Sequence, residues 1–165
     1  MAKVKEGNSS LKRTSHSYYS GETSNIFGSL SKGADLMDGI LAECKKHNIR
    51  SGVVNCIGSL EKVGYVLFQT KDGYPSGYSN KIEIDAPVEL ISGTGFICEN
   101  ENGELDIHLH GLVTEENGRL SAGHFVSGEN PTLITVEFSI IQSEDVKALR
   151  TFDQDLGFKV INFSE

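Results

Sequence analysis

The sequence predicts an α+β domain, in which an antiparallel or mixed β-sheet carries one main amphipathic helix and a short C-terminal helix. The 165 residues include 18 glycines but only three prolines, a balance typical of many strands joined by tight turns. One segment with helical periodicity precedes a succession of segments with strand composition. A hydrophobic content of 38% is ordinary for one globular domain with its own core.

The first ordered elements are a strand and then the main helix. Residues 1–16 are polar and mildly basic, which predicts a flexible N-terminal arm. Ser24–Leu30 has the composition of a strand. Asp35 lies in the first turn of the predicted helix, and Asn48 can end it in a left-handed conformation. The apolar face of this helix consists of Leu36, Ile40, Leu41 and Cys44.

Two strands and a loop are expected next. Ser51–Gly58 and Lys62–Gln69 have strand composition and are separated by a short turn. The segment Lys71–Asn80 is predicted to be a loop, in which Tyr74 and Tyr78 can border a pocket.

The C-terminal half continues the sheet. Val88–Cys98 is predicted to be a long strand whose internal glycines indicate a bulge or a close approach of another backbone. Pro131–Ile141 alternates cleanly and predicts a final central or near-central strand. Ser143 is expected to cap a short helix through Arg150. Leu156–Phe163 is apolar enough to add a strand or to cover a neighbouring subunit. These elements divide the chain into the arm, a domain over residues 17–142 and an extension over residues 143–165.

The segment Glu104–Val126 contains three of the five histidines in one predicted hairpin. Strand alternation places Asp106, His108 and His110 on one face. Imidazoles two residues apart on a strand stand roughly 7 Å apart at the backbone, so both can reach one metal ion.

The turn decides whether His124 joins this pair. A two-residue loop would pair Glu116 with Arg119 and place His124 opposite Gly111, on the wrong face. A three-residue loop with Gly118 in the left-handed position pairs residue 115 with residue 119 and places His110 opposite His124. We predict the three-residue loop.

Three neutral imidazoles favour Zn²⁺ or a similar divalent ion, with a fourth position left for water or substrate. The predicted metal ligands are therefore His108, His110 and His124. The alternative is that these histidines only form hydrogen bonds across the sheet or at a seam between subunits. Glu89 and Asp106 are the candidate acid/base groups if the site is catalytic.

Charge and cysteine usage restrict the partners. A formal charge of −8 repels phosphate backbones, so direct DNA binding by this chain is disfavoured. The three cysteines contain no Cys-x-x-Cys pair and no secretory signal precedes them, which predicts buried reduced thiols in a cytoplasmic protein. No apolar run approaches the ~18 residues of a membrane span.

The order of motifs resembles the plants-and-prokaryotes-conserved (PPC) domain over roughly residues 18–141. The motifs that carry this resemblance are Gly33–Leu36, Gly58, Val88–Ser92, Ile107–Gly111 and Gly118–His124. The resemblance implies an α+β fold and a homotrimer. Bacterial stand-alone members of the family, the PD1-like proteins, are often described as DNA-binding. This chain lacks the Arg-Gly-Arg-Pro core of the AT-hook that accompanies the plant domains.

The fold is also similar to that of acetolactate decarboxylase, in which a His-x-His pair and a later histidine hold zinc. His108, His110 and His124 match these positions by motif. Three hypotheses follow from the sequence. The chain is a trimeric metal-binding or regulatory module, a metal-dependent lyase or hydrolase acting on a small oxo- or hydroxy-carboxylate, or a DNA-associated protein that acts through a partner.

Overall fold

The computed structural model describes residues 15–165, so the predicted arm of residues 1–16 lies almost entirely outside the described residues. The elements follow the chain as β1 (Thr23–Ser31), α1 (Leu36–Lys46), β2 (Gly52–Leu60), β3 (Val63–Val66), β4 (Phe68–Lys71), β5 (Tyr74–Tyr78), β6 (Ile82–Ile84), β7 (Val88–Asn100), β8 (Leu105–Glu115), β9 (Leu120–Phe125), β10 (Thr132–Ser143), β11 (Lys147–Asp153) and β12 (Phe158–Ser164).

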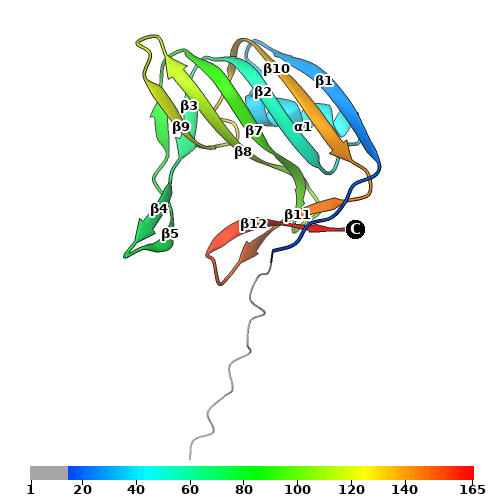
Figure 1. Cartoon of the computed structure of the whole chain (residues 1–165). Helices are drawn as coiled ribbons and strands as arrows, with labels where there is room; N and C mark the ends of the chain where they lie inside the picture. Colours follow the sequence, from blue (N-terminus) through cyan, green and yellow to red (C-terminus); the bar gives the residue numbers. More distant parts are fainter. Residues whose placement is uncertain (1–14) are drawn as a thin grey trace, which may run out of the picture.

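One large sheet dominates the structure, as Figure 1 shows. Its strands lie in the order β1-β10-β2-β7-β8-β9-β3-β6, and all neighbours along this path are antiparallel. β11 adds to the end of β7 in parallel and pairs with β12. β4 and β5 form a separate two-stranded sheet. The mixed sheet is thus confirmed, and β10, which was expected to be central or near-central, is an interior strand next to the edge strand β1.

Helix α1 covers one face of the sheet (Figure 1). The Asp35 side chain caps it by accepting hydrogen bonds from the backbone amides of Met37 and Asp38 at 3.0 and 3.1 Å. Asn48 follows the helix with a φ of 58°, as predicted. Leu36 and Ile40 of the helix are fully buried against the sheet, where they join the inward side chains of the strands in the core.

Within residues 15–165, the opposite face of the sheet carries no helix. Residues that pair directly across strands share a face, and one such row runs from Phe27 through Ser139, Asn55 and Thr94 to His110. We call this the histidine face. Several large apolar side chains on this face are exposed to solvent, and Phe27 is 82% exposed.

The predicted C-terminal helix is wrong, because Lys147–Asp153 forms β11 instead. Ser143 does cap this segment, since its hydroxyl accepts a hydrogen bond from the amide of Val146 at 3.0 Å. The chain then extends, and alternate side chains at Val146, Ala148 and Arg150 are buried. Leu149, which a helix would have turned inward, is 42% exposed. The apolar segment after it forms β12, one of the two predicted alternatives.

The predicted loop Lys71–Asn80 is also wrong, since its first part is a β-hairpin with β4. Asp72 and Gly73 both have positive φ, at 54° and 79°, and this is the backbone that a two-residue hairpin turn requires. The predicted strand Lys62–Gln69 is interrupted at Leu67, whose amide donates to the Ser79 hydroxyl at 3.0 Å. In the part of the chain that the structure describes, no helix is long and apolar enough to cross a membrane.

Candidate metal centre

The histidine hairpin of β8 and β9 has the predicted register. The amide of Glu115 donates to the carbonyl of Arg119 at 2.9 Å, and Gly118 has a φ of 81°. His110 therefore lies directly opposite His124. The three-residue loop is confirmed, and with it the prediction that one face gathers three imidazoles.

The three imidazoles converge on a common point. Nε2 of His108 lies 3.1 Å from Nε2 of His110, which in turn lies 3.3 Å from Nδ1 of His124. One ring nitrogen of each histidine lies within 4.8 Å of the other two. Two nitrogen ligands at 2.0–2.1 Å from a tetrahedral zinc ion stand roughly 3.3 Å apart, so two of the three separations already match this geometry.

The side of the hairpin that faces the helix holds this arrangement in place. Leu109, between the two histidines of β8, is fully buried, and so is Phe125, which follows His124. The Phe125 ring lies across Gly111, where an added Cβ would stand 2.2 Å from Cζ of the ring. Because Gly111 has no side chain, the Phe125 ring can pack directly over the β8 backbone and help to fix His124 relative to His110.

The environment of the imidazoles keeps them neutral. Burial, aided by the charge of Arg150 and by His110, lowers the pKa of His108 to about 4 from its usual 6.5. Burial and the charges of His108, Arg150 and His110 lower the pKa of His124 to about 4 as well. The pKa of His110 is also lowered, first by burial and then by Arg150. Neutral imidazole is the form that binds metal ions, so protons compete weakly for these nitrogens near neutral pH.

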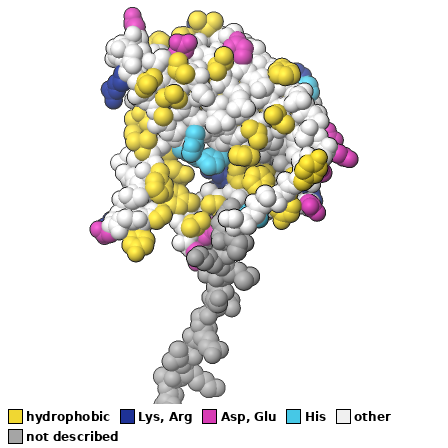
Figure 2. Space-filling model, viewed as in Figure 1, with side chains coloured by type: hydrophobic (Ala, Val, Ile, Leu, Met, Phe, Trp, Pro, Cys, Tyr) yellow, Lys and Arg dark blue, Asp and Glu magenta, His cyan; other side chains and the backbone are white. Residues whose placement is uncertain are grey.

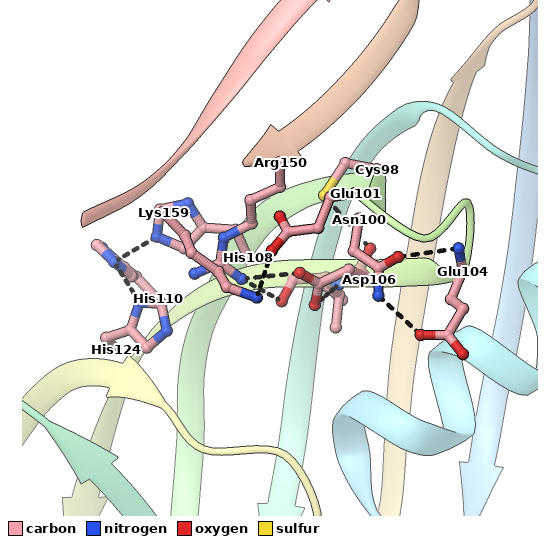
Figure 3. A network of polar contacts seen from close by, with 11 residues as sticks. Cys98, Asn100, Glu101, Glu104, Asp106, His108, His110, His124, Arg150 and Lys159 are labelled. Atoms are coloured by element: carbon pink, nitrogen blue, oxygen red, sulfur yellow. Dashed lines mark hydrogen bonds and ion pairs between the residues drawn. The ribbon is translucent and has the colours of Figure 1, made fainter. Parts of the chain in front are cut away.

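A buried arginine lies beside the histidines. Arg150 of β11 is only 9% exposed, and its Nη1 donates to Oδ2 of Asp106 at 3.3 Å and to the carbonyl of Ile107 at 3.5 Å. Figure 3 shows its side chain extending from the C-terminal hairpin toward His108 and Asp106. Sequence reasoning missed Arg150, because its segment was assigned to a helix and its partner lies 44 positions away.

Two hollows flank the imidazoles on the histidine face, where Figure 2 shows the histidines near the centre of the visible surface. The larger has a volume of about 690 Å³ and is bordered by Leu67, Phe68, Tyr78 and Leu112 as well as the three histidines. Tyr78 packs against His124 with ring centroids 5.1 Å apart, so this tyrosine does border a pocket. Tyr74 does not line it and is 75% exposed.

The two candidate acid/base groups lie in different places. Asp106 shares the histidine face and forms the ion pair with Arg150. Glu89 pairs with Thr114 and lies five positions along β7 from Thr94, the residue opposite His110. Glu89 borders another hollow, with a volume of about 1040 Å³.

The three cysteines are free and buried, as predicted, and burial raises the pKa of their thiols to about 11 or 12. Among the described residues, the group that can hold a metal ion consists of the three histidines alone.

Comparison with known proteins agrees with this fold. A candidate DNA-binding protein from Bacteroides thetaiotaomicron superposes with a TM-score of 0.73 at 24% identity, covering 86% of this chain and 93% of its own. A metal-containing protein from Archaeoglobus fulgidus gives 0.72 at 19% identity, covering 90% and 98%. A plant- and prokaryote-conserved protein from Pyrococcus horikoshii gives 0.73 at 24% identity, covering 90% and 99%.

Acetolactate decarboxylase from Bacillus subtilis subspecies spizizenii is a weaker match, with a TM-score of 0.45 at 15% identity, covering 81% of this chain and 57% of the enzyme. No curated protein matches the sequence. The model of the Plants and Prokaryotes Conserved domain matches residues 18–144, most of the chain. β11 and β12 lie beyond that match. The chain therefore belongs to the Plants and Prokaryotes Conserved domain family.

Proposed function

We propose that this protein binds one divalent metal ion, with zinc as the preferred ion, through His108, His110 and His124. The convergence of three neutral ring nitrogens carries the proposal. Their donor set and spacing suit zinc, and three protein ligands leave a fourth position for water or a ligand. The Archaeoglobus fulgidus neighbour is described as metal-containing, which supports the same assignment.

Metal analysis of the purified protein tests this site. We expect about one zinc ion per chain in the wild type after loading and dialysis, and a loss of most of it in His108→Ala. The matched control is His47→Ala, because His47 lies at the exposed end of α1 and outside the histidine group. Equal zinc content in the wild type and in His108→Ala would refute the proposal.

We further propose that the protein acts as a homotrimeric binding or regulatory module. The open apolar surface of the histidine face supports self-association, because Phe27, Ile57 and Ile141 are all at least half exposed there. The expected result is a trimer mass in light scattering. Phe27→Asp should shift the mass toward the monomer, whereas Tyr19→Asp should leave it unchanged, although Tyr19 is 88% exposed. A wild-type monomer would exclude the trimer.

A metal-dependent lyase or hydrolase acting on a small oxo- or hydroxy-carboxylate is the second candidate function. The hollow of about 690 Å³ beside the imidazoles favours it, because a metal there would face space for a substrate. Asp106 is better placed than Glu89 as the acid/base group, since it lies two positions from His108 on the same strand, whereas Glu89 pairs with Thr114, four positions along β8 from His110. Turnover that survives Asp106→Asn would exclude this role.

A further inference from the structure

The C-terminal hairpin β11–β12 lies beyond the family match, yet it forms one wall of the histidine site. The smaller hollow, of about 400 Å³, has Thr94, Phe96 and two of the histidines on the sheet side and Lys159, Val160 and Phe163 on the hairpin side. Figure 3 shows Arg150 and Lys159 on the side of the imidazoles from which this hairpin approaches. This segment therefore adds two cationic side chains to the surroundings of the site.

Arg150 is buried with part of its hydrogen-bonding capacity unused. Within the described residues both side-chain hydrogen bonds of its guanidinium leave from Nη1, and the buried Nε has no partner. A guanidinium carries five N–H donors, and leaving buried donors unpaired costs free energy. Its planar fork matches a carboxylate or phosphate group, and an oxyanion beside the imidazoles would accept from Nη2, which takes part in neither of these hydrogen bonds.

The charge around the site also favours an anion. Asp106 offsets the charge of Arg150, and Lys159 is 3.9 Å from Glu101. A divalent ion on the histidines would then leave an excess of about two positive charges in a half-buried place. An arginine is an unfavourable neighbour for a metal ion alone, because like charges repel. A bound oxyanion would offset part of this excess charge.

The larger hollow is lined by aromatic side chains that can contact a short apolar group of a ligand. Phe68 of β4 and Tyr78 of β5 pack against Phe158 of β12, with ring centroids 5.6 and 5.3 Å apart. This aromatic contact joins the two projecting hairpins, and Phe68 and Tyr78 also line the larger hollow. The site thus presents cations on one side of the imidazoles and aromatic rings on another.

We propose that the C-terminal hairpin completes the site by recognising the oxyanion of a small ligand. Arg150 donates to a carboxylate or phosphate oxygen, and the apolar part of the ligand contacts Phe68 and Tyr78. This inference rests on the proposed metal site, because the ligand would approach the metal at its free position.

Titration of the cobalt-loaded protein tests this assignment, since the visible spectrum of Co²⁺ reports changes at its coordination sphere. The probes are butanoate, inorganic phosphate and the neutral butanamide. We expect a saturable spectral change with at least one oxyanion and none with butanamide at the same concentration. Binding of butanoate would identify a carboxylate as the recognised group, and binding of inorganic phosphate would identify a phosphate.

Arg150→Gln should weaken that binding by about tenfold or more while the protein retains cobalt, because a charge-assisted hydrogen bond is lost. Arg150→Lys should recover part of the affinity, since it restores the charge without the fork. Lys147→Gln is the matched control, because Lys147 lies on the same strand and its side chain contacts the Glu165 backbone at 3.1 Å. Its affinity should equal that of the wild type.

Removing Arg150 alone leaves Asp106 without its partner, so the double variant Asp106→Asn/Arg150→Gln serves if the single variant does not fold. Two results would overturn the role of the hairpin and leave the metal site standing. One is a wild-type protein that binds cobalt but neither oxyanion. The other is an unchanged oxyanion affinity in the folded Arg150 variants. A wild-type protein that holds no metal would overturn the proposed metal site and this inference together.

Discussion

The two faces of the large sheet are formed by the same strands but have different roles. On the helix-covered face, Ile140 and Leu109 are fully buried. On the histidine face, their neighbours along the same strands are half-buried or exposed, and Ile141 is 50% exposed. Since side chains alternate along a strand, each strand contributes to both faces at once. The covered face supplies the core that holds the backbone, and this support allows the open face to carry side chains selected for their chemistry.

Truncating adjacent isoleucines on β10 should show this difference most strongly. Ile140→Ala opens a cavity in the core and should lower the free energy of unfolding by about 2–5 kcal/mol. Ile141→Ala removes the same atoms from the open face and should cost less than about 1 kcal/mol in the isolated chain. Urea denaturation of both variants measures the two values. Similar losses would mean that the histidine face is covered in solution, as a trimer interface would require.

Gly111→Ala should be the next largest change, because it affects both faces through one residue. The new Cβ would stand 2.2 Å from the Phe125 ring, so this buried ring or the strand that carries it must shift, at a cost of about 1–3 kcal/mol. That shift also displaces His110 and His124, so zinc affinity should fall. Thermal unfolding and metal analysis give the two readings, with Gly21→Ala as the control because its nearest atom lies at 3.4 Å. Unchanged zinc affinity in a destabilised protein would show that packing on the helix-covered face does not control the geometry of the histidine site.

The metal-free protein should lose stability as the pH falls from about 6.5 to about 4. In this range His108 and His124 take up protons in the unfolded chain, but their folded-state pKa of about 4 delays protonation in the native protein. The unfolded state therefore binds more protons, and stability declines toward acid. Thermal melts across this range should show a smaller decline in His108→Gln/His124→Gln than in the wild type. His47→Gln should behave as the wild type.

DNA binding should show the smallest effect. The charge of −8 opposes phosphate contact, so a mobility shift assay at physiological salt should give no shift with the chain alone. Family neighbours described as candidate DNA-binding proteins make this measurement informative. A shift that persists at that salt concentration would support the DNA-associated hypothesis and show that local charge outweighs net charge.

Local sequence patterns predicted the parts of the site that depend on nearby residues. Strand alternation placed His108 and His110 together, and the turn at Gly118 fixed His124 opposite them. The Asp72–Gly73 dipeptide carries a similar hairpin signal, which the loop prediction for this segment did not use.

The remainder of the site depends on contacts between distant segments. Val146 and Leu149 are spaced as in a helix, although the burial of Val146, Ala148 and Arg150 shows strand alternation. Arg150 is buried because β11 pairs with β7 and brings Asp106 within reach. No local pattern in the sequence indicates this pairing, so a buried arginine at this position was not foreseeable.

The position of β10 between β1 and β2 has a consequence for how the chain folds. Leu30 pairs with Val136, so β1 gains its neighbour only when a segment more than a hundred positions later arrives. Closing so long a loop is entropically costly, and proteins dominated by such contacts fold slowly. During synthesis the edge of β1 would stay unpaired while most of the chain emerges. The time during which that edge is open to other chains is therefore set by the synthesis of β10.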